Sequence, residues 1–197
     1  MSTNKIYIGI DPGSDGAMAI MWPEIPATAT SDATPARITL HPFKDESPYK
    51  IADLLKKAKE IAPILVTVED VHSRPTDGGV QAFAFGHNVG LIHGFLIANC
   101  IPYITVSPQN WQSEIWIRND KVYKPLKAYP KETEEEAADG KKKRKPRPQV
   151  DPKPTSINAA RRLFPEVSLL RTPKCTKPHD GISDSLLICE YGRRKNL

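Results

Sequence analysis

Four carboxylates stand at positions where folding could bring them together. Asp11 follows an apolar run that ends in a glycine-rich turn, and Glu69 closes the β-branched run "ILVTVE". Asp180 and Asp184 are four residues apart at the start of an expected helix, so they share one face of it. Carboxylates that converge repel one another unless cations compensate, and oxygen ligands of this kind suit Mg²⁺ or Mn²⁺. These acids are our candidates for metal binding and catalysis, because two bound ions can assist hydrolysis of a phosphodiester.

Each acid also has an ordinary interpretation. Aspartate before Pro-Gly is usually a turn residue, and glutamate at the end of a strand is usually solvated. Aspartate at the start of a helix is usually a cap. The joint placement of the four acids is therefore what favours a metal site.

The elements expected to position these acids alternate along the chain. Strands are expected at 5–10, 16–22, 38–43, 64–70 and 102–108, and helices at 48–61, 80–100, from 108, at 156–166 and at about 181–193. Three early strands joined as a meander, followed by helix-linked strands, predict an α/β fold. We expect a mixed five-stranded sheet with antiparallel first three strands and helices on both faces. Parallel pairing of the first and fourth strands would place Asp11 and Glu69 at the same end of the sheet.

Charge and composition divide the chain unevenly. The net charge is +5, but residues 1–117 hold 8 basic and 12 acidic side chains, whereas residues 118–197 hold 20 and 11. A basic second half indicates a polyanionic partner, although a solvated tail would give the same count. Residues 118–155 are rich in proline and charge and lack apolar periodicity. We predict one domain, 1–197, with a flexible basic insertion at about 118–155.

Other features of the composition narrow the class of protein. We find no secretory signal pattern and no apolar stretch that approaches the roughly 20 residues needed to cross a bilayer, so no membrane association is expected. Cys100, Cys175 and Cys189 are expected to be free thiols. "CTKPH" has a plausible zinc spacing but lacks a matching second pair.

Several segments together resemble the RuvC family of Holliday-junction resolvases, especially its phage-encoded branch, within the ribonuclease H-like superfamily. They are "IGIDPGSDGA", "VTVEDVHS", "FAFGHNVGLIHGFLIANCIPYITVSPQNWQ" and "HDGISDSLLICEYGRR". The resemblance covers roughly residues 5–117 and 155–193. It implies a ribonuclease H-like fold and a homodimeric, Mg²⁺-dependent endonuclease that nicks two strands of a four-way junction symmetrically. It implies no small-molecule substrate.

The family's metal-binding acids match this chain at three positions, Asp11, Glu69 and Asp184. The fourth matches less cleanly, because bacterial members usually carry it where this chain has Gly181. Asp180 is our candidate, and His179 stays an alternative. His72 falls where bacterial members often have an aromatic near the crossover; it could stack there, or it could be a plain loop residue.

Basic residues supply candidates for contacts with DNA phosphates. The predicted DNA-binding set is His72, Arg74, Lys141, Lys142, Lys143, Arg144, Lys145, Lys153, Arg161 and Arg162. The run "KKKRKPR" also resembles a nuclear import signal. We expect a cytoplasmic protein, of a bacterial host if phage-encoded, with a nuclear location left open.

Other aromatic residues are expected to pack. Trp111 and Trp116 are assigned to the core, and Phe83 and His93 of the long helix to packing or a dimer interface. The competing functions are a ribonuclease H-like module that binds branched DNA without cleaving it, and a nuclease for RNA–DNA hybrids. The two-lobed sugar-kinase fold is disfavoured because 197 residues with one such set of strands and helices cannot supply its second lobe.

Overall fold

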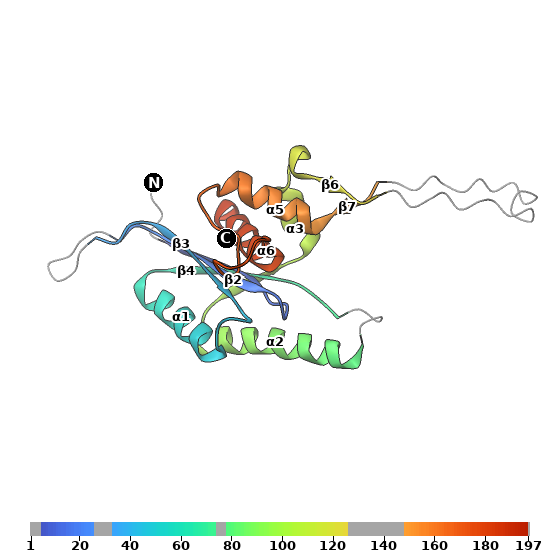
Figure 1. Cartoon of the computed structure of the whole chain (residues 1–197). Helices are drawn as coiled ribbons and strands as arrows, with labels where there is room; N and C mark the ends of the chain where they lie inside the picture. Colours follow the sequence, from blue (N-terminus) through green and yellow to red (C-terminus); the bar gives the residue numbers. More distant parts are fainter. Residues whose placement is uncertain (1–4, 26–32, 74–77, 126–147, 197) are drawn as a thin grey trace, which may run out of the picture.

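A central five-stranded sheet organises the protein (Figure 1). The computed structural model describes residues 5–25, 33–73, 78–125 and 148–196. In chain order, the elements are β1 (Ile6–Asp11), β2 (Ala17–Trp22), β3 (Arg37–Pro42), α1 (Pro48–Ile61), β4 (Ile64–Glu69), α2 (Gly79–Ala98), β5 (Tyr103–Val106), α3 (Pro108–Ile115), η1 (Arg118–Asp120), β6 (Val122–Tyr123), β7 (Val150–Asp151), α5 (Pro152–Leu163) and α6 (Asp180–Lys195).

The strand order is β3-β2-β1-β4-β5. β1 pairs antiparallel with β2, and β2 pairs antiparallel with β3. β4 runs parallel to β1, and β5 runs parallel to β4. This arrangement confirms the expected α/β fold with a mixed five-stranded sheet whose first three strands are antiparallel.

Helices cover both faces of the sheet, as expected (Figure 1). α1 and α2 pack on one face over a core that includes Ile8, Ile20 and Leu55. α3, α5 and α6 cover the other face, where Trp111 and Leu186 are fully buried. Alternate residues of each strand therefore contribute to two separate apolar layers, as the period of two in a strand requires.

α1 begins as its sequence predicts. Ser47 is the N-cap, and its Oγ accepts a hydrogen bond from the backbone N–H of Lys50 at 3.2 Å. Pro48 occupies the first turn, where its missing N–H leaves no bond unmade.

The predicted insertion has narrower limits in the structure. Residues 118–123 form η1 and β6, and β6 pairs with β7 just before α5. α5 begins at Pro152 rather than near residue 156, with Asp151 as its N-cap. The prolines at 152 and 154 indicated a loop, but the first turn of a helix tolerates proline. Residues 126–147 lie outside the described part of the chain, so the expectation of flexibility stays a prediction there.

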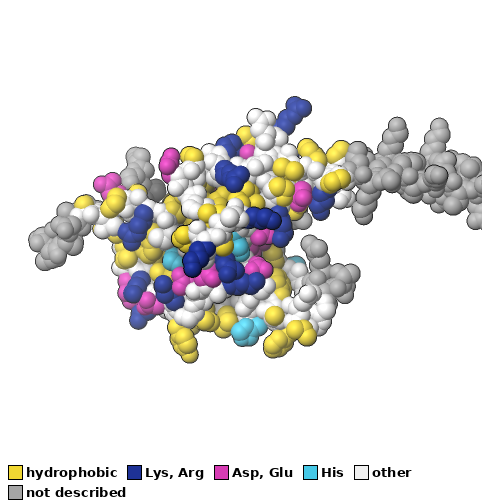
Figure 2. Space-filling view, viewed as in Figure 1, with side chains coloured by type: hydrophobic (Ala, Val, Ile, Leu, Met, Phe, Trp, Pro, Cys, Tyr) yellow, Lys and Arg dark blue, Asp and Glu magenta, His cyan; other side chains and the backbone are white. Residues whose placement is uncertain are grey.

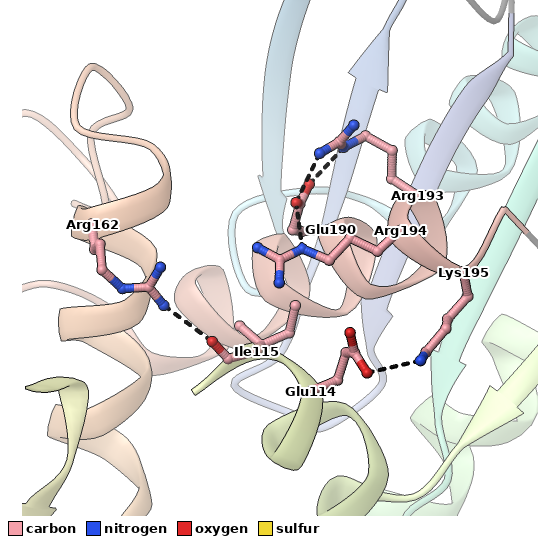
Figure 3. A network of polar contacts seen from close by, with 7 residues as sticks. All are labelled: Glu114, Ile115, Arg162, Glu190, Arg193, Arg194 and Lys195. Atoms are coloured by element: carbon pink, nitrogen blue, oxygen red, sulfur yellow. Dashed lines mark hydrogen bonds and ion pairs between the residues drawn. The ribbon is translucent and has the colours of Figure 1, made fainter. Parts of the chain in front are cut away.

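The C-terminal turns of α6 are fastened by ion pairs (Figure 3). Glu190 is buried and accepts hydrogen bonds from the guanidinium groups of Arg193 and Arg194. Lys195 Nζ lies 2.7 Å from Glu114 Oε2 of α3. The two arginine pairs lie within α6, and the lysine pair links its last turn to α3.

The long helix α2 is apolar and mostly exposed. Val80 is 86% exposed, Phe83 77% and Ile97 66%, and only Ile92 and Leu96 are buried. Apolar and histidine side chains line the lower edge of the molecule over α1 and α2 (Figure 2). By length and composition α2 could span a membrane, contrary to the expectation that no segment would, although a single such helix is weak support for a membrane protein.

Candidate active site

Two of the predicted acids end adjacent parallel strands. β1 and β4 pair in register as far as Ile10 and Val68, so Asp11 and Glu69 follow side by side at the carboxyl ends. Burial raises the pKa of Asp11 to about 6, and the charge of Asp180 adds to the rise. Burial likewise raises the pKa of Glu69 to about 7, assisted by repulsion from Asp11. The two carboxyl groups therefore lie together at one edge of the sheet, and both hold their protons more tightly than free acids do.

Close packing of α6 brings the remaining two acids to the same edge. A Cβ at Gly9 would lie 2.2 Å from the backbone nitrogen of Cys189, so only glycine lets α6 approach β1 this closely. A Cβ at Gly181 would meet the carbonyl oxygen of Asp15 at 2.2 Å, so the start of α6 rests on the β1–β2 turn. These two glycines set the position of the helix acids relative to Asp11.

Asp184 is the acid whose ionised form is most disfavoured by its surroundings. Burial raises its pKa well above the usual value, and the charges of Asp11 and Glu69 raise it further. The hydroxyl of Ser156 in α5 favours the ionised form, yet neither that hydroxyl nor Asp184 Oδ1 makes a regular hydrogen bond within the described residues. A buried carboxylate oxygen without a partner is costly, and a cation would compensate it.

Asp180 differs because it has a cationic partner. Its Oδ2 lies 2.5 Å from Lys153 Nζ at the start of α5. Burial opposes ionisation of Asp180, but the Lys153 ammonium outweighs burial and holds its pKa below the usual value. His179, the alternative fourth ligand, is the N-cap of α6, and its Nδ1 accepts from the backbone N–H of Ile182 at 3.4 Å. Of the two candidates, Asp180 is the one whose charge acts on Asp11 and Asp184.

The four acids suit a hard divalent cation in type and charge. Their mutual repulsion and the unpartnered Asp184 oxygen are what a bound cation would relieve. Within the described ranges, however, no three His, Cys, Asp or Glu side chains already form a closed metal-binding group. The acids are thus brought into electrostatic contact but are not arranged as a finished coordination shell.

One contributor was missed by sequence reasoning. Trp111 is buried, as expected, but its indole Nε1 also donates a hydrogen bond to Glu69 Oε1 at 2.8 Å. The pairing of Glu69 with Val106 places the end of β5 beside the acid, and α3 begins two residues later. The sequence offered a signal for this contact, because a helix that directly follows the neighbouring strand begins close to Glu69.

The predicted DNA-binding residues are dispersed. Arg74, Lys141, Lys142, Lys143, Arg144 and Lys145 lie outside the described residues. Lys153 is at the site, and its side chain is 73% exposed. His72 lies 3.7 Å from Asp70 and is 83% exposed.

The two arginines of α5 differ from each other. Arg161 is exposed. Arg162 binds the buried Asp120 through two hydrogen bonds of 2.9 and 2.8 Å and also donates to the carbonyl of Ile115 (Figure 3). Its guanidinium therefore ties α5 to η1 and α3. A further basic residue, Lys44, was not predicted and forms an ion pair with Asp15 in the turn beside Asp11.

Comparisons with known proteins are distant. The sequence matches no protein-family profile and no curated protein. Among solved structures, T. thermophilus RuvC in complex with Holliday junction substrate has a TM-score of 0.49 and 12% identity, over 97% of this chain and 94% of that chain. A Thermus thermophilus RuvC structure has a TM-score of 0.44 and 12% identity, over 97% and 96%. Both proteins carry the name of the family that the motifs resemble, but likenesses this distant leave the activity to be inferred from the site.

Proposed function

We propose that this chain is a metal-dependent, structure-selective DNA endonuclease that resolves four-way junctions by paired nicks. The observation that carries the proposal is the convergence of acids from β1, β4 and α6 at one edge, with a buried Asp184 oxygen left without a partner. A set of acids kept at such electrostatic cost suits a catalytic role better than a structural one.

The proposed metal ligands are Asp11, Glu69 and Asp184, with Asp180 as the fourth. They would hold up to two Mg²⁺ ions, which Mn²⁺ could replace. When bound, such ions supply activation of a water molecule and stabilisation of the leaving oxygen of a phosphodiester. The protein's part is to hold four negative charges at a fixed edge that stays open to a nucleic-acid backbone.

Lys153 and Lys44 flank this edge with positive charge. Lys44 pairs with Asp15 beside the cluster, Lys153 pairs with Asp180 of the cluster itself, and each keeps about half or more of its side chain exposed. An exposed ammonium beside the acids can contact a phosphate and offset its repulsion by the carboxylates. Arg161 and the basic run at 141–145 remain proposed sequence-independent contacts.

A homodimer is proposed because symmetric nicks need two sites related by two-fold symmetry. α2 offers the surface: its exposed apolar side chains are flanked by Gly86, Gly90 and Gly94, whose Cβ positions have no neighbour within 4 Å. Their spacing of four residues places them on one side of the helix, so a partner helix could approach closely. Sedimentation equilibrium of the purified protein should give a dimer.

The deciding experiment compares substrates and metals. Labelled four-way junction, replication fork, linear duplex and RNA–DNA hybrid are incubated with the protein with and without Mg²⁺, and the cuts are mapped. We expect Mg²⁺-dependent nicks at symmetric positions in two strands of the junction. Binding without cleavage would replace the proposal by a branched-DNA binding module, and preferred cleavage of the hybrid would replace it by a hybrid nuclease.

Site variants test the mechanism. Asp11→Asn, Glu69→Gln and Asp184→Asn should each abolish nicking while leaving junction binding intact, because each keeps the shape and removes one charge. Asp53→Asn is the matched control, since Asp53 is an exposed acid of α1 that pairs with Lys57. Full turnover by any of the three site variants would contradict the assignment.

A further inference from the structure

Trp111 holds one oxygen of the Glu69 carboxylate. The Nε1–Oε1 distance is 2.8 Å. The two residues are 42 positions apart in the sequence and belong to different elements, α3 and β4. Trp111 is fully buried, and Glu69 Oε1 is the acceptor that satisfies its indole N–H. This bond therefore restricts both the ring and the carboxylate.

The ring itself cannot move freely. Trp116 packs edge-on against Trp111 with ring centroids 5.8 Å apart. Trp111 is one of the largest fully buried side chains and belongs to the core beneath α6. A fixed donor of this kind selects one orientation of a glutamate side chain, which otherwise has three rotatable bonds.

Trp116 provides an internal comparison. It lies at the end of the same helix and has the same indole, but its buried Nε1 has no hydrogen-bond partner within the described residues. The two tryptophans thus share packing and differ in the bond to Glu69.

We propose that Trp111 is a positioning residue: by engaging Oε1, it leaves Oε2 of Glu69 as the oxygen that would bind a catalytic cation. This inference rests on the metal site of the proposed function. Single-oxygen ligation suits Mg²⁺, which needs compact octahedral geometry, whereas Ca²⁺ readily takes both oxygens of a carboxylate. Trp111 therefore favours Mg²⁺ over Ca²⁺ at this site.

The test measures metal binding directly in the full-length protein. Mg²⁺ and Ca²⁺ affinities are determined by isothermal titration calorimetry for wild type, Trp111→Phe and Trp116→Phe. We expect Trp111→Phe to weaken Mg²⁺ binding on the order of 10-fold, as for other residues that orient a metal ligand. Ca²⁺ binding should weaken less, so the Mg²⁺/Ca²⁺ preference falls. Trp116→Phe keeps an aromatic ring beside Trp111 and removes only an N–H that has no partner within the described residues, so it should change that preference much less than Trp111→Phe does.

Two further proteins separate positioning from packing. Replacement of Trp111 by 3-benzothienylalanine keeps the bicyclic shape and removes the N–H, so it should reproduce the loss even if Trp111→Phe folds poorly. In a Glu69→Gln background, Trp111→Phe should have little further effect on Mg²⁺ binding, since the two residues act through one bond.

Equal loss of Mg²⁺ and Ca²⁺ affinity, or an affinity unchanged by the benzothienyl replacement, would overturn the inference. Wild-type protein that binds neither cation would overturn it as well. A protein that shows the Trp111-dependent preference but cleaves no junction would support the inference while refuting the proposed function. Junction cleavage with no effect at Trp111 would do the reverse.

Discussion

Asp11→Asn should make the metal-free protein more stable at neutral pH while removing its activity. The variant keeps an oxygen that can accept the hydrogen bond from the Gly13 N–H, which is 3.1 Å from Asp11 Oδ1 in the structure. What it loses is a charge that burial and neighbouring acids disfavour, as the rise of the Asp11 pKa from 3.8 to about 6 indicates.

The size and the sign of the expected stability change follow from this rise in pKa. Two pKa units correspond to about 3 kcal/mol, and since Asp11 keeps partial exposure to solvent we expect about 1 to 3 kcal/mol. The folded state holds its proton more tightly than the unfolded state, so wild type has the full benefit below pH 4 and loses it as the pH rises through about 6. The gain from Asp11→Asn should therefore be near zero at pH 4 and complete at pH 8.

Urea denaturation in EDTA at the two pH values measures this difference, with Asp53→Asn as the control that changes little at either. Adding Mg²⁺ should stabilise wild type, because a ligand that binds only the folded state does so, and should stabilise Asp11→Asn much less. A variant no more stable than wild type at pH 8, or one whose gain is equal at pH 4, would refute the account of an electrostatically strained site.

Three further predictions concern the frame and the assembly. Gly9→Ala should destabilise the protein by several kcal/mol in urea unfolding, because the added methyl would overlap the backbone of α6, whereas Gly79→Ala, with open space around it, should cost nothing. Asp120→Asn should cost about 2 kcal/mol at pH 7 by removing the charged partner of Arg162. Because that bond lowers the Asp120 pKa, the difference should vanish as the pH falls below 4, and a constant difference would contradict it. Phe83→Glu should shift sedimentation from dimer to monomer, and an unchanged mass would exclude α2 as the interface.

The sheet and the meeting of the strand-end acids could be predicted because both depend on local pattern. Alternating apolar runs predicted the strands, and the helical connection before β4 predicted that β4 runs parallel to β1. Parallel pairing of these two strands was enough to place Asp11 beside Glu69. The spacing of Asp180 and Asp184 on α6 needed only the helical repeat.

Contacts between residues far apart in the chain could not be predicted in the same way. Arg162 looked like a DNA contact because α5 is basic, but its partner Asp120 is 42 positions away and buried. The bond from Trp111 to Glu69 is equally distant in sequence. Prolines at the start of α5 were taken for a loop because their effect depends on which turn of a helix they occupy.

The acids of the proposed site come from segments far apart in the sequence, so the site depends on the docking of α6. During translation β1 is made before α6, and α6 must then pack on Gly9. A truncated product that stops before residue 180 would carry Asp11 and Glu69 without their helical counterparts, and one apolar layer would stay uncovered. If the proposed function is right, a chain that lacks α6 would therefore lack the means to cut DNA.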